Sequence, residues 1–499
     1  MANVADLVRA AAARRPGGVA LVHLPTVGPR TATTWSALDT DVDATAAGLR
    51  TALGLHEGDR VALAMANTPA FVTSYFAVLR AGLVAVPLNT GYTAPEIARL
   101  LAEADVKVVL CDDSTLTVVE EAVAGSHRVH IDPAGLDAVT AAGRGSAAPT
   151  TDRGGEDLAV LMFTSGTSGR PRAAMLTHRA LLTNLEQCLA LEPTPMGEDD
   201  VVLLVLPLFH IYGLNTGLGM VAATAATGVL VERFDPVNTA ALVRAEGVTN
   251  IPGAPPMYVA WAAAEAYEKL RGVRILASGA SSLPPAVLEQ VQTAVGITIR
   301  EGYGLTETAP VVTSTLASPV VKAGSIGRPI PGVEVRLVDE GGTDVLDDAG
   351  ELWVRGANLF SGYWPDGSGG PDPDGWWATG DVGYADEDGD LFLVDRRKEL
   401  VIVSGFNVYP REVEDALAEH PDVAEVAVIA VPHPYTGEAV KAFVVPRDGA
   451  ALQPEDVTAH AATRLARFKR PTIVTLVAAL PHSATGKVAK GKLRESEQR

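Results

Sequence analysis

The segment Leu158-Ala-Val-Leu-Met-Phe-Thr164-Ser-Gly-Thr-Ser-Gly-Arg-Pro-Arg172 decides the fold of this chain and points to its chemistry. The apolar run at 158–163 has the length and composition of a strand buried on both faces of a parallel sheet. A loop of glycine, hydroxyl and cationic residues follows at once, and a helical stretch is expected from His178. Such a loop can bring backbone N–H groups and hydroxyls around phosphate oxygens. A flexible surface loop is the alternative, but the position after a buried strand favours phosphate binding.

Similar apolar runs recur on both sides of this segment and alternate with helical stretches rich in Ala and Leu. This alternation predicts an α/β fold with doubly wound parallel sheets. The polar, Gly-rich stretch 143–156 predicts a link between two α/β lobes, at about 1–150 and 151–320. The other apolar runs are 60–66, 106–110, 201–206, 228–231 and 273–277.

The sequence changes character after about residue 320. Short apolar runs among Gly, Pro and Asp predict a small antiparallel sheet or β-barrel-like subdomain over about 321–394. About a hundred residues of βα pattern follow, enough for a smaller, separate α+β domain. We therefore expect a large domain over 1–395, a hinge at Asp395 and a mobile C-terminal domain over 396–499.

Composition limits the classes of partner. The 499 residues carry a formal charge of -20, which disfavours nucleic acid and anionic membranes as main partners because the net field repels phosphate. Only Cys111 and Cys188 occur, which fits a reducing compartment such as the cytoplasm. Charged residues interrupt the N-terminal stretch 1–16, so we expect no secretory signal. The uncharged stretch 201–231 contains Pro, Asn and several Gly, and is expected to fold as strand, loop and buried helix instead of crossing a membrane.

Several nucleotide and metal motifs are absent. The loop at 164–172 lacks the Lys-Ser/Thr pair of a Walker loop, and Gly302-Tyr-Gly304 has Glu307 where a dinucleotide fingerprint needs glycine. The acidic residues at 386, 388 and 390 start like a calcium loop, but the later ligand positions do not match, so an acidic turn is expected.

Six short motifs, in addition to the loop at 164–172, occur in the order and at the separations typical of one family, so the chain resembles the adenylate-forming superfamily. This superfamily contains acyl-CoA synthetases, firefly luciferases and adenylation domains of nonribosomal synthesis, and the resemblance extends over essentially the whole chain. Besides the loop at 164–172, the motifs are Leu206-Pro-Leu-Phe-His210, Gly302-Tyr-Gly-Leu-Thr-Glu307-Thr308, Trp377-Ala-Thr-Gly-Asp381, Asp395-Arg396-Arg397-Lys398, Ser404-Gly-Phe-Asn-Val-Tyr-Pro410 and Thr485-Gly-Lys487.

The resemblance implies a two-step reaction that uses ATP, Mg²⁺ and CoA. A carboxylic acid first attacks the α-phosphate of ATP, which gives an acyl-adenylate and pyrophosphate, and the thiol of CoA then displaces AMP. The small domain turns about Asp395 between the two steps, so that one pocket serves both. The partners implied are small molecules; the resemblance leaves a homodimer open and allows at most peripheral contact with a membrane.

The resemblance also assigns roles residue by residue. Lys487 is the catalytic cation of adenylation, an effect commonly worth about two to three orders of magnitude in rate. His210 gates the acyl pocket or the CoA channel, although a core histidine is almost as good an interpretation. Arg172 replaces the lysine usual in the family, which leaves the geometry of its phosphate contact open. The phosphate loop comprises Thr164, Ser165, Gly166, Thr167, Ser168, Gly169 and Arg172.

The remaining assignments concern the nucleotide, the metal and the acyl group. Tyr303, between Gly302 and Gly304, stacks on adenine, and Asp381 binds the ribose hydroxyls; core packing and a turn are the simpler interpretations of each. For the other residues the resemblance gives catalysis at the α-phosphate by Thr306, catalysis and Mg²⁺ binding by Glu307, a metal contact by Thr164, a ribose or phosphate contact by Arg396, thiol-tunnel contacts by Gly405 and Phe406, and acyl contacts by His210, Gly279, Ala280 and Gly304.

The acid itself is inferred from the stretches 210–213, 253–256, 278–281 and 302–305, which should line the acyl pocket. They are small or apolar and contain no Arg or Lys that could neutralise a second carboxylate, so we expect a medium- or long-chain fatty acid. Two other hypotheses stay open: a fatty acyl-AMP ligase that delivers to a carrier protein, and a non-catalytic nucleotide- or acyl-binding regulator.

Overall fold

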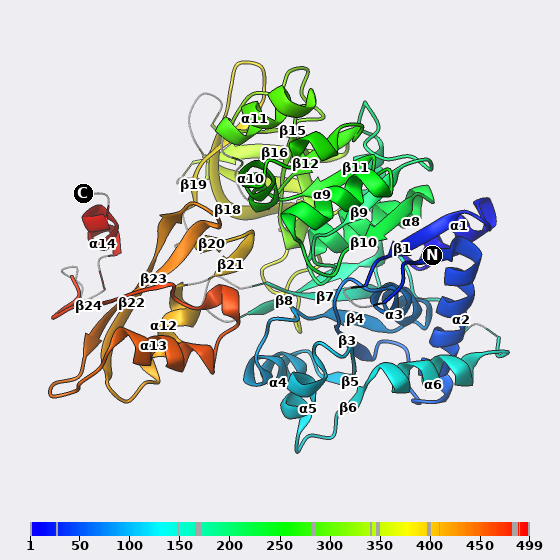
Figure 1. Cartoon of the computed structure of the whole chain (residues 1–499), viewed down its shortest axis with the longest axis horizontal. Coiled ribbons are helices and arrows are strands. Elements are labelled where there is room, and N and C mark those ends of the chain that lie inside the picture. The colour runs from blue at the N-terminus through cyan, green and yellow to red at the C-terminus, as the bar shows by residue number, and fades with distance from the viewer. Residues whose placement is uncertain are drawn as a thin grey trace.

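The chain folds into a large α/β domain and a smaller C-terminal domain, which lies on the side away from the N-terminus (Figure 1). This arrangement confirms the fold class expected from the sequence. The computed structural model describes residues 2–25, 28–147, 149–164, 171–280, 283, 285–339, 342–345, 350–396, 401–408, 410–481, 488 and 490–497.

The first sheet of the large domain has six strands in the order β6-β5-β3-β4-β7-β8. Its strands run parallel except for β8, which returns antiparallel to β7. Helices alternate with the strands, as the apolar runs predicted. The elements up to residue 189 that belong to this part are α2 (Trp35–Thr51), β3 (Arg60–Ala64), α3 (Pro69–Arg80), β4 (Val84–Pro87), α4 (Ala94–Glu103), β5 (Val106–Cys111), α5 (Leu116–Val123), β6 (Val129–Ile131), α6 (Pro133–Gly143), β7 (Leu158–Thr164), β8 (Arg172–Thr177) and α7 (His178–Leu189).

The second sheet has thirteen strands in the order β16-β17-β18-β19-β15-β14-β13-β12-β11-β9-β10-β1-β2. The strands from β13 to β1 in this order are parallel, which places their carboxyl ends along one edge. The elements of this part are α1 (Asp6–Arg14), β1 (Val19–His23), β2 (Thr31–Thr34), β9 (Val201–Leu204), a π-helix (Tyr212–Gly219), α8 (Met220–Thr224), β10 (Thr227–Leu230), α9 (Pro236–Ala245), β11 (Asn250–Gly253), α10 (Pro255–Ala263), a 3₁₀ turn (Tyr267–Leu270), β12 (Ile275–Ser278), α11 (Pro285–Val295), β13 (Arg300–Gly304) and a 3₁₀ turn (Thr306–Thr308).

The antiparallel strands expected after residue 320 are present, but they extend the second sheet instead of forming a sheet of their own. The join is β14, which pairs antiparallel with β13 through Gly302 and Ser314 and so carries hydrogen bonding from the parallel strands into the antiparallel ones. These strands are β14 (Val311–Ser314), β15 (Ser325–Pro329), β16 (Val333–Val338), β17 (Gly350–Gly356), β18 (Trp376–Ala385) and β19 (Leu391–Arg396).

The division near residue 150 expected from the sequence is not the division between the two sheets. The N-terminal strands β1 and β2 pair with β10 in the second sheet, whereas β7 and β8, beyond residue 150, complete the first. The cause is pairing between strands far apart in the chain, which a change in composition at 143–156 does not reveal.

The C-terminal domain has its own apolar core and its own sheet, which is antiparallel except that β24 pairs parallel with β23. Its long hairpin of β22 and β23 carries helices beside it (Figure 1). The elements are β20 (Val401–Val403), β21 (Phe406–Val408), α12 (Pro410–Ala418), β22 (Val423–His433), β23 (Gly437–Pro446), α13 (Pro454–Ala462), a 3₁₀ turn (Arg467–Lys469), β24 (Ile473–Leu476) and α14 (Lys490–Glu497).

The uncharged stretch 201–231 folds as a strand, a π-helix, a short helix and a second strand inside the large domain. Within the described parts of the chain, no helix has both the length and the apolar character needed to cross a membrane. The interpretation as strand, loop and buried helix is therefore confirmed.

Candidate functional site

A cavity of about 280 Å³ lies where the two sheets and the C-terminal domain meet. The ends of β7, β12 and β13 supply Thr164, Ser278 and Gly304, in keeping with the rule that ligands bind at the carboxyl ends of parallel strands. The C-terminal domain closes it with Gly405, Phe406, Phe468 and Lys469. The cavity therefore gathers residues from all three parts of the chain.

Tyr303 and Asp381 contact each other in one wall of the cavity. Both side chains are buried, and the Tyr303 hydroxyl donates a hydrogen bond of 2.7 Å to Oδ2 of Asp381. The backbone N–H of Asp381 donates to Oγ1 of Thr379. The aromatic ring and the carboxylate are thus held together, as a base-stacking residue and a ribose-binding residue would need to be.

The glycines beside Tyr303 are required by close packing. A Cβ on Gly304 would collide with the carbonyl group of Pro310, and one on Gly302 would lie 3.0 Å from the carbonyl oxygen of Thr313. Both glycines also line the cavity. Side chains are therefore excluded where the strand approaches the ligand space.

A second cluster joins Glu307, Tyr363 and Arg172. The hydroxyl of Tyr363 donates a hydrogen bond of 2.6 Å to Oε1 of Glu307, which is buried on the 3₁₀ turn after β13. The Arg172 guanidinium lies 3.6 Å above the Tyr363 ring, a cation–π distance. Arg172 therefore sits on a flat aromatic surface that suits its planar group, and Tyr363 connects it to the carboxylate.

The oxygen groups at this end fit a hard divalent cation. Glu307 and Thr164 both line the cavity, and carboxylate and hydroxyl oxygens are ligands that Mg²⁺ accepts. Because Glu307 accepts a hydrogen bond from the Tyr363 hydroxyl, its carboxylate is held in a fixed orientation, as a metal ligand needs to be.

Several predicted residues lie outside the described part of the chain. These are Lys487 and the loop residues Ser165, Gly166, Thr167, Ser168 and Gly169. The described flanks of the loop, Thr164 and Arg172, face each other in the β7–β8 ladder. The helix expected from His178 is present as α7, and strand β8 lies between it and the loop.

Asp395 and Arg396 end strand β19, where the backbone of Arg396 pairs with Asp381. This register brings the end of the large domain's last strand beside the predicted ribose site. The hinge role of Asp395 stays a prediction.

His210 lines the cavity just before the π-helix. Its ring is half-buried, and Nδ1 accepts a hydrogen bond of 3.3 Å from the backbone N–H of Tyr212. Burial lowers the pKa of His210 to about 4, so the ring is neutral near neutral pH. A steric or hydrogen-bonding role suits it better than a charged one.

The other end of the cavity is mainly apolar. Gly279 and Ala280 lie there as predicted, and Tyr212 packs against Gly279, whose Cβ would lie 3.1 Å from the ring. Residues that the sequence did not single out complete the wall: Cys188, Leu191, Met196, Met220, Ile275 and Leu316. Both Cys111 and Cys188 are free and buried, as expected.

Two parts of the predicted acyl lining are wrong. Residues 253–256 do not line the cavity, because β11 turns into α10 there; from β11, Asn250 and Pro252 reach the cavity instead. Arg300 and Glu301, outside the chosen stretches, do line it. Arg300 donates a hydrogen bond of 3.4 Å to the carbonyl of Thr315, and burial raises the pKa of Glu301 to about 7. The lining therefore contains ionisable groups that the argument from composition excluded.

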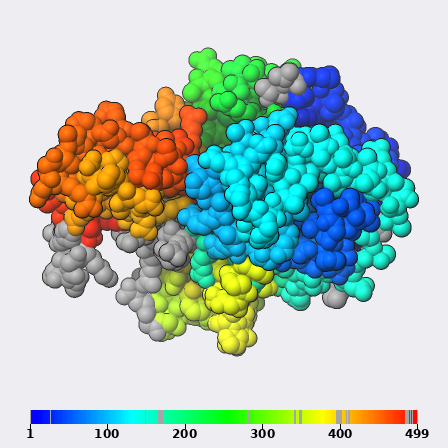
Figure 2. Space-filling view, turned by 90° about the horizontal axis from the view of Figure 1, so that it is seen from below, coloured from blue at the N-terminus to red at the C-terminus, as the bar shows by residue number. Residues whose placement is uncertain are grey.

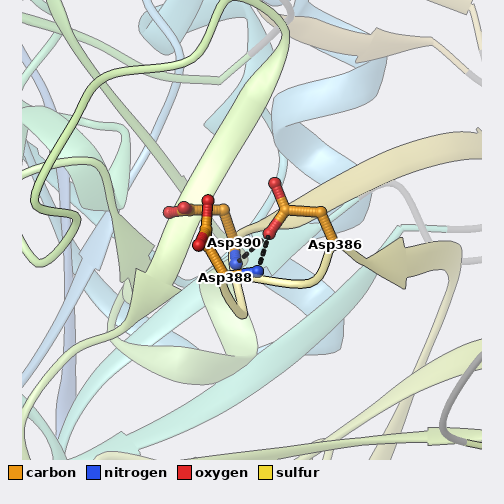
Figure 3. Close-up of side chains that lie close together, drawn as sticks. All are labelled: Asp386, Asp388 and Asp390. Carbon is orange, nitrogen blue, oxygen red and sulfur yellow. Dashed lines mark hydrogen bonds between the residues drawn. The ribbon is translucent and has the colours of Figure 1, made fainter.

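The acidic turn at 386–390 is separate from this cavity and already has a cation. Figure 3 shows backbone N–H groups of Asp388 and Asp390 directed at the carboxylate of Asp386. The ammonium of Lys322 lies 2.6, 2.6 and 3.2 Å from Asp386, Asp388 and Asp390. The single lysine offsets part of the charge of the three carboxylates, and the backbone hydrogen bonds close the acidic turn expected from the sequence.

Comparison with known proteins identifies two matching families. The family "AMP-binding enzyme" matches residues 8–364, and "AMP-binding enzyme C-terminal domain" matches residues 412–487. The long-chain-fatty-acid–CoA ligase of Bacillus subtilis is 34% identical over 486 residues, covering 89% of this chain and 86% of the relative. The feruloyl-CoA synthase of an Amycolatopsis species is 37% identical over 471 residues, covering 93% and 94%.

A solved structure matches over both domains. A double mutant of the o-succinylbenzoate CoA synthetase of Bacillus subtilis, bound with its product analogue, has a TM-score of 0.86, with 26% identity and 98% of each chain covered.

Proposed function

Because this chain belongs to the AMP-binding enzymes, as an ATP-dependent, AMP-forming ligase that joins an acyl or aryl acid to CoA, we propose that its acid is a medium- or long-chain fatty acid. The enzyme uses ATP, Mg²⁺ and CoA. The observation that carries the fatty acid is the apolar end of the cavity, built by Cys188, Leu191, Met196, Met220 and Leu316.

In the first step, the acid's carboxylate attacks the α-phosphorus of ATP, and the bond to pyrophosphate breaks. Tyr303 stacks on adenine, and Asp381 accepts hydrogen bonds from the ribose hydroxyls. Asp381 also accepts a hydrogen bond from the Tyr303 hydroxyl. The loop that begins at Thr164 holds the β- and γ-phosphates. Thr306 contacts the α-phosphate, and Lys487 offsets the charge that develops there.

Glu307 and Thr164 would hold Mg²⁺, which supplies charge neutralisation at the phosphates when bound. Tyr363 keeps the Glu307 carboxylate in place through its hydroxyl. From its position on the Tyr363 ring, the planar Arg172 guanidinium lines the cavity and would contact the phosphates.

In the second step, the thiol sulfur of CoA bonds to the acyl carbon, the bond from that carbon to the phosphate oxygen breaks, and AMP leaves. Gly405 and Phe406 line the cavity from the C-terminal domain, and Phe406 stacks on Phe209 at 6.5 Å between ring centroids. This arrangement supports a thiol channel between the two domains. Neutral His210, next to Phe209, borders the same passage.

The proposal competes with two other kinds of acid. Relatives act on feruloyl groups, and the Arg300 guanidinium in the lining could pair with a second carboxylate. Arg300 already donates to a backbone carbonyl, and Leu191, Met196 and Met220 offer an apolar surface, which favours an aliphatic chain.

ATP–pyrophosphate exchange and CoA consumption, measured with saturated acids of increasing chain length, ferulate, coumarate and malonate, test the proposal. We expect the highest kcat/KM with a medium- or long-chain fatty acid. A higher value with an aryl acid or malonate would contradict it. Exchange without CoA consumption would instead indicate delivery to a carrier protein.

A further inference from the structure

A buried cluster of charges lies between the two domains, at the edge of the cavity. It consists of Glu96, Lys469 and Glu412, which we call the interdomain cluster; their side chains are 4%, 2% and 6% exposed. The Lys469 ammonium lies 2.8 Å from Oε1 of Glu412 and 3.4 Å from Oε1 of Glu96. Buried charges of this kind are costly unless they are paired, so the contact is specific to this arrangement of the domains.

The two carboxylates belong to different domains. Glu412 lies on α12, in the same domain as Lys469, whereas Glu96 lies on α4, on the side of the large domain that faces the C-terminal domain (Figure 1). In Figure 2 the orange C-terminal domain is in contact with the light blue part of the large domain. If the C-terminal domain turned away, Glu412 would travel with Lys469, and Glu96 would stay behind.

The two carboxylate oxygens of Glu96 bind different partners. Oε2 accepts hydrogen bonds of 2.8 and 2.9 Å from the backbone N–H and hydroxyl of Thr93, which cap α4 within the large domain. Oε1 faces the other domain, where it meets Lys469 and accepts a hydrogen bond of 3.3 Å from the backbone N–H of Ala466. The cap fixes the carboxylate in advance, so little conformational entropy is lost when the other domain docks.

The neighbours of the interdomain cluster favour a charged lysine. Burial opposes the charge, but Tyr92, Glu412 and Glu96 together raise the pKa of Lys469. Its ammonium lies 4.7 Å from the centroid of the Tyr92 ring, and Arg99 lies 3.6 Å from Glu412. Without Lys469, two buried carboxylates would face each other across the domain boundary.

The interdomain cluster is continuous with the proposed thiol channel. Phe468, next to Lys469, packs on Phe406 at 4.7 Å between centroids, and Phe406 contacts Phe209 of the large domain. Movement of Lys469 away from Glu96 would therefore also remove Phe406 and Gly405 from the cavity.

We propose that Lys469 is a positioning residue for the thiol step, which holds the C-terminal domain over the cavity by pairing with Glu96 in this orientation alone. The inference rests on the two-step reaction described above. It implies that Glu96 and Lys469 stabilise one of the two domain orientations and contribute nothing to adenylate formation.

Half-reactions of the full-length enzyme test this role. Glu96→Gln and Lys469→Met should slow thioester formation from supplied acyl-AMP and CoA about tenfold or more, which is a usual size for coupling between sites. Pyrophosphate exchange should stay within about twofold of the wild-type rate. Lys469→Arg should restore part of the thiol step. The matched control is Lys441→Met, which removes a lysine that pairs at 2.6 Å with Glu497 inside the C-terminal domain and should leave both steps unchanged. An equal loss of both steps, or an unchanged thiol step, would overturn the proposal.

The domain orientation is measured separately, without substrates. Spin labels on Val237→Cys in the large domain and Ile473→Cys in the C-terminal domain occupy exposed positions, whereas both native cysteines are buried. The wild type should show a population of distances between the two labels that corresponds to the docked C-terminal domain. We expect this population to disappear in Glu96→Gln and to remain in Lys441→Met. An unchanged distribution in Glu96→Gln would contradict the proposal even if the acid were assigned wrongly.

Discussion

The two ends of the cavity are built in different ways. At the nucleotide end, polar side chains are paired with one another: Tyr303 with Asp381, and Tyr363 with Glu307. At the acid end, apolar side chains such as Cys188, Met196 and Met220 come from separate parts of the chain and offer a ligand van der Waals contact.

This difference indicates where the reaction and the specificity reside. Hydrogen-bonded pairs fix groups to a fraction of an ångström, which phosphoryl chemistry requires. An apolar wall accepts any acid of suitable volume and discriminates by about 1–3 kcal/mol for each methylene. A change at the nucleotide end should therefore lower the activity with every acid alike, and a change at the acid end should alter the order of preference among acids.

The largest effect is expected for Asp381→Asn. The amide loses one of the two acceptor oxygens that the ribose and Tyr303 share, and kcat/KM in ATP–pyrophosphate exchange should fall about 100-fold for all acids. Asp374→Asn, at an exposed turn before the same strand, is the control and should leave exchange unchanged. A loss confined to one acid would contradict the separation of the two ends.

A smaller effect is expected for Tyr363→Phe. The ring that supports Arg172 stays, but the donor to Glu307 is lost, so the Mg²⁺ concentration that gives half-maximal exchange should rise about tenfold. The KM for the acid should not change. Tyr384→Phe, an exposed tyrosine stacked on Phe392, provides the control. If Mg²⁺ dependence is unchanged and the KM for the acid rises, Tyr363 belongs to the acid end.

The same difference explains what could be predicted from the sequence. The residues of the nucleotide end lie in short contiguous motifs, so Tyr303, Glu307 and Asp381 could each be named, and the structure brings all three to the cavity. Strand bounds were also accessible: the run at 158–163 begins at the first residue of β7 and ends one residue before its last.

The acid end was largely hidden because no motif marks which apolar residues face a cavity and which face the core. Cys188 on α7 and Leu316 after β14 meet only through the fold. Arg300 could have been found, since it lies two residues before Gly302 and alternation along β13 puts both on one face. Strand β8 was missed because Ala173-Ala174-Met175-Leu176 suits a helix as well as a strand.

At the acid end, Gly279→Ala should change preference more than rate. The added methyl group would lie 3.1 Å from the Tyr212 ring, which must then move into the acid space. We expect kcat/KM to fall about fivefold for the longest acids and less for short ones, with the KM for ATP unchanged. Gly17→Ala, where a Cβ meets no atom within 4 Å, is the control. An equal loss for short and long acids would show that Gly279 serves the nucleotide instead.

The smallest effect on activity is expected for Glu301→Gln, which tests a lining carboxyl. Among the described residues, no side chain donates to Glu301 as Tyr363 does to Glu307 and Tyr303 to Asp381. Oε2 of Glu301 accepts a hydrogen bond of 3.3 Å from the backbone N–H of Leu283, but burial raises the pKa from 4.5 to about 7. The folded protein therefore binds more protons than the unfolded chain between these pH values, and stability falls as pH rises through them, by at most about 3 kcal/mol. Glutamine does not titrate, so the variant should not lose this stability. The difference in melting temperature between the variant and the wild type should therefore shift in favour of the variant from pH 5 to pH 8. A constant difference across that range would mean that burial does not raise the pKa of Glu301 in the folded protein.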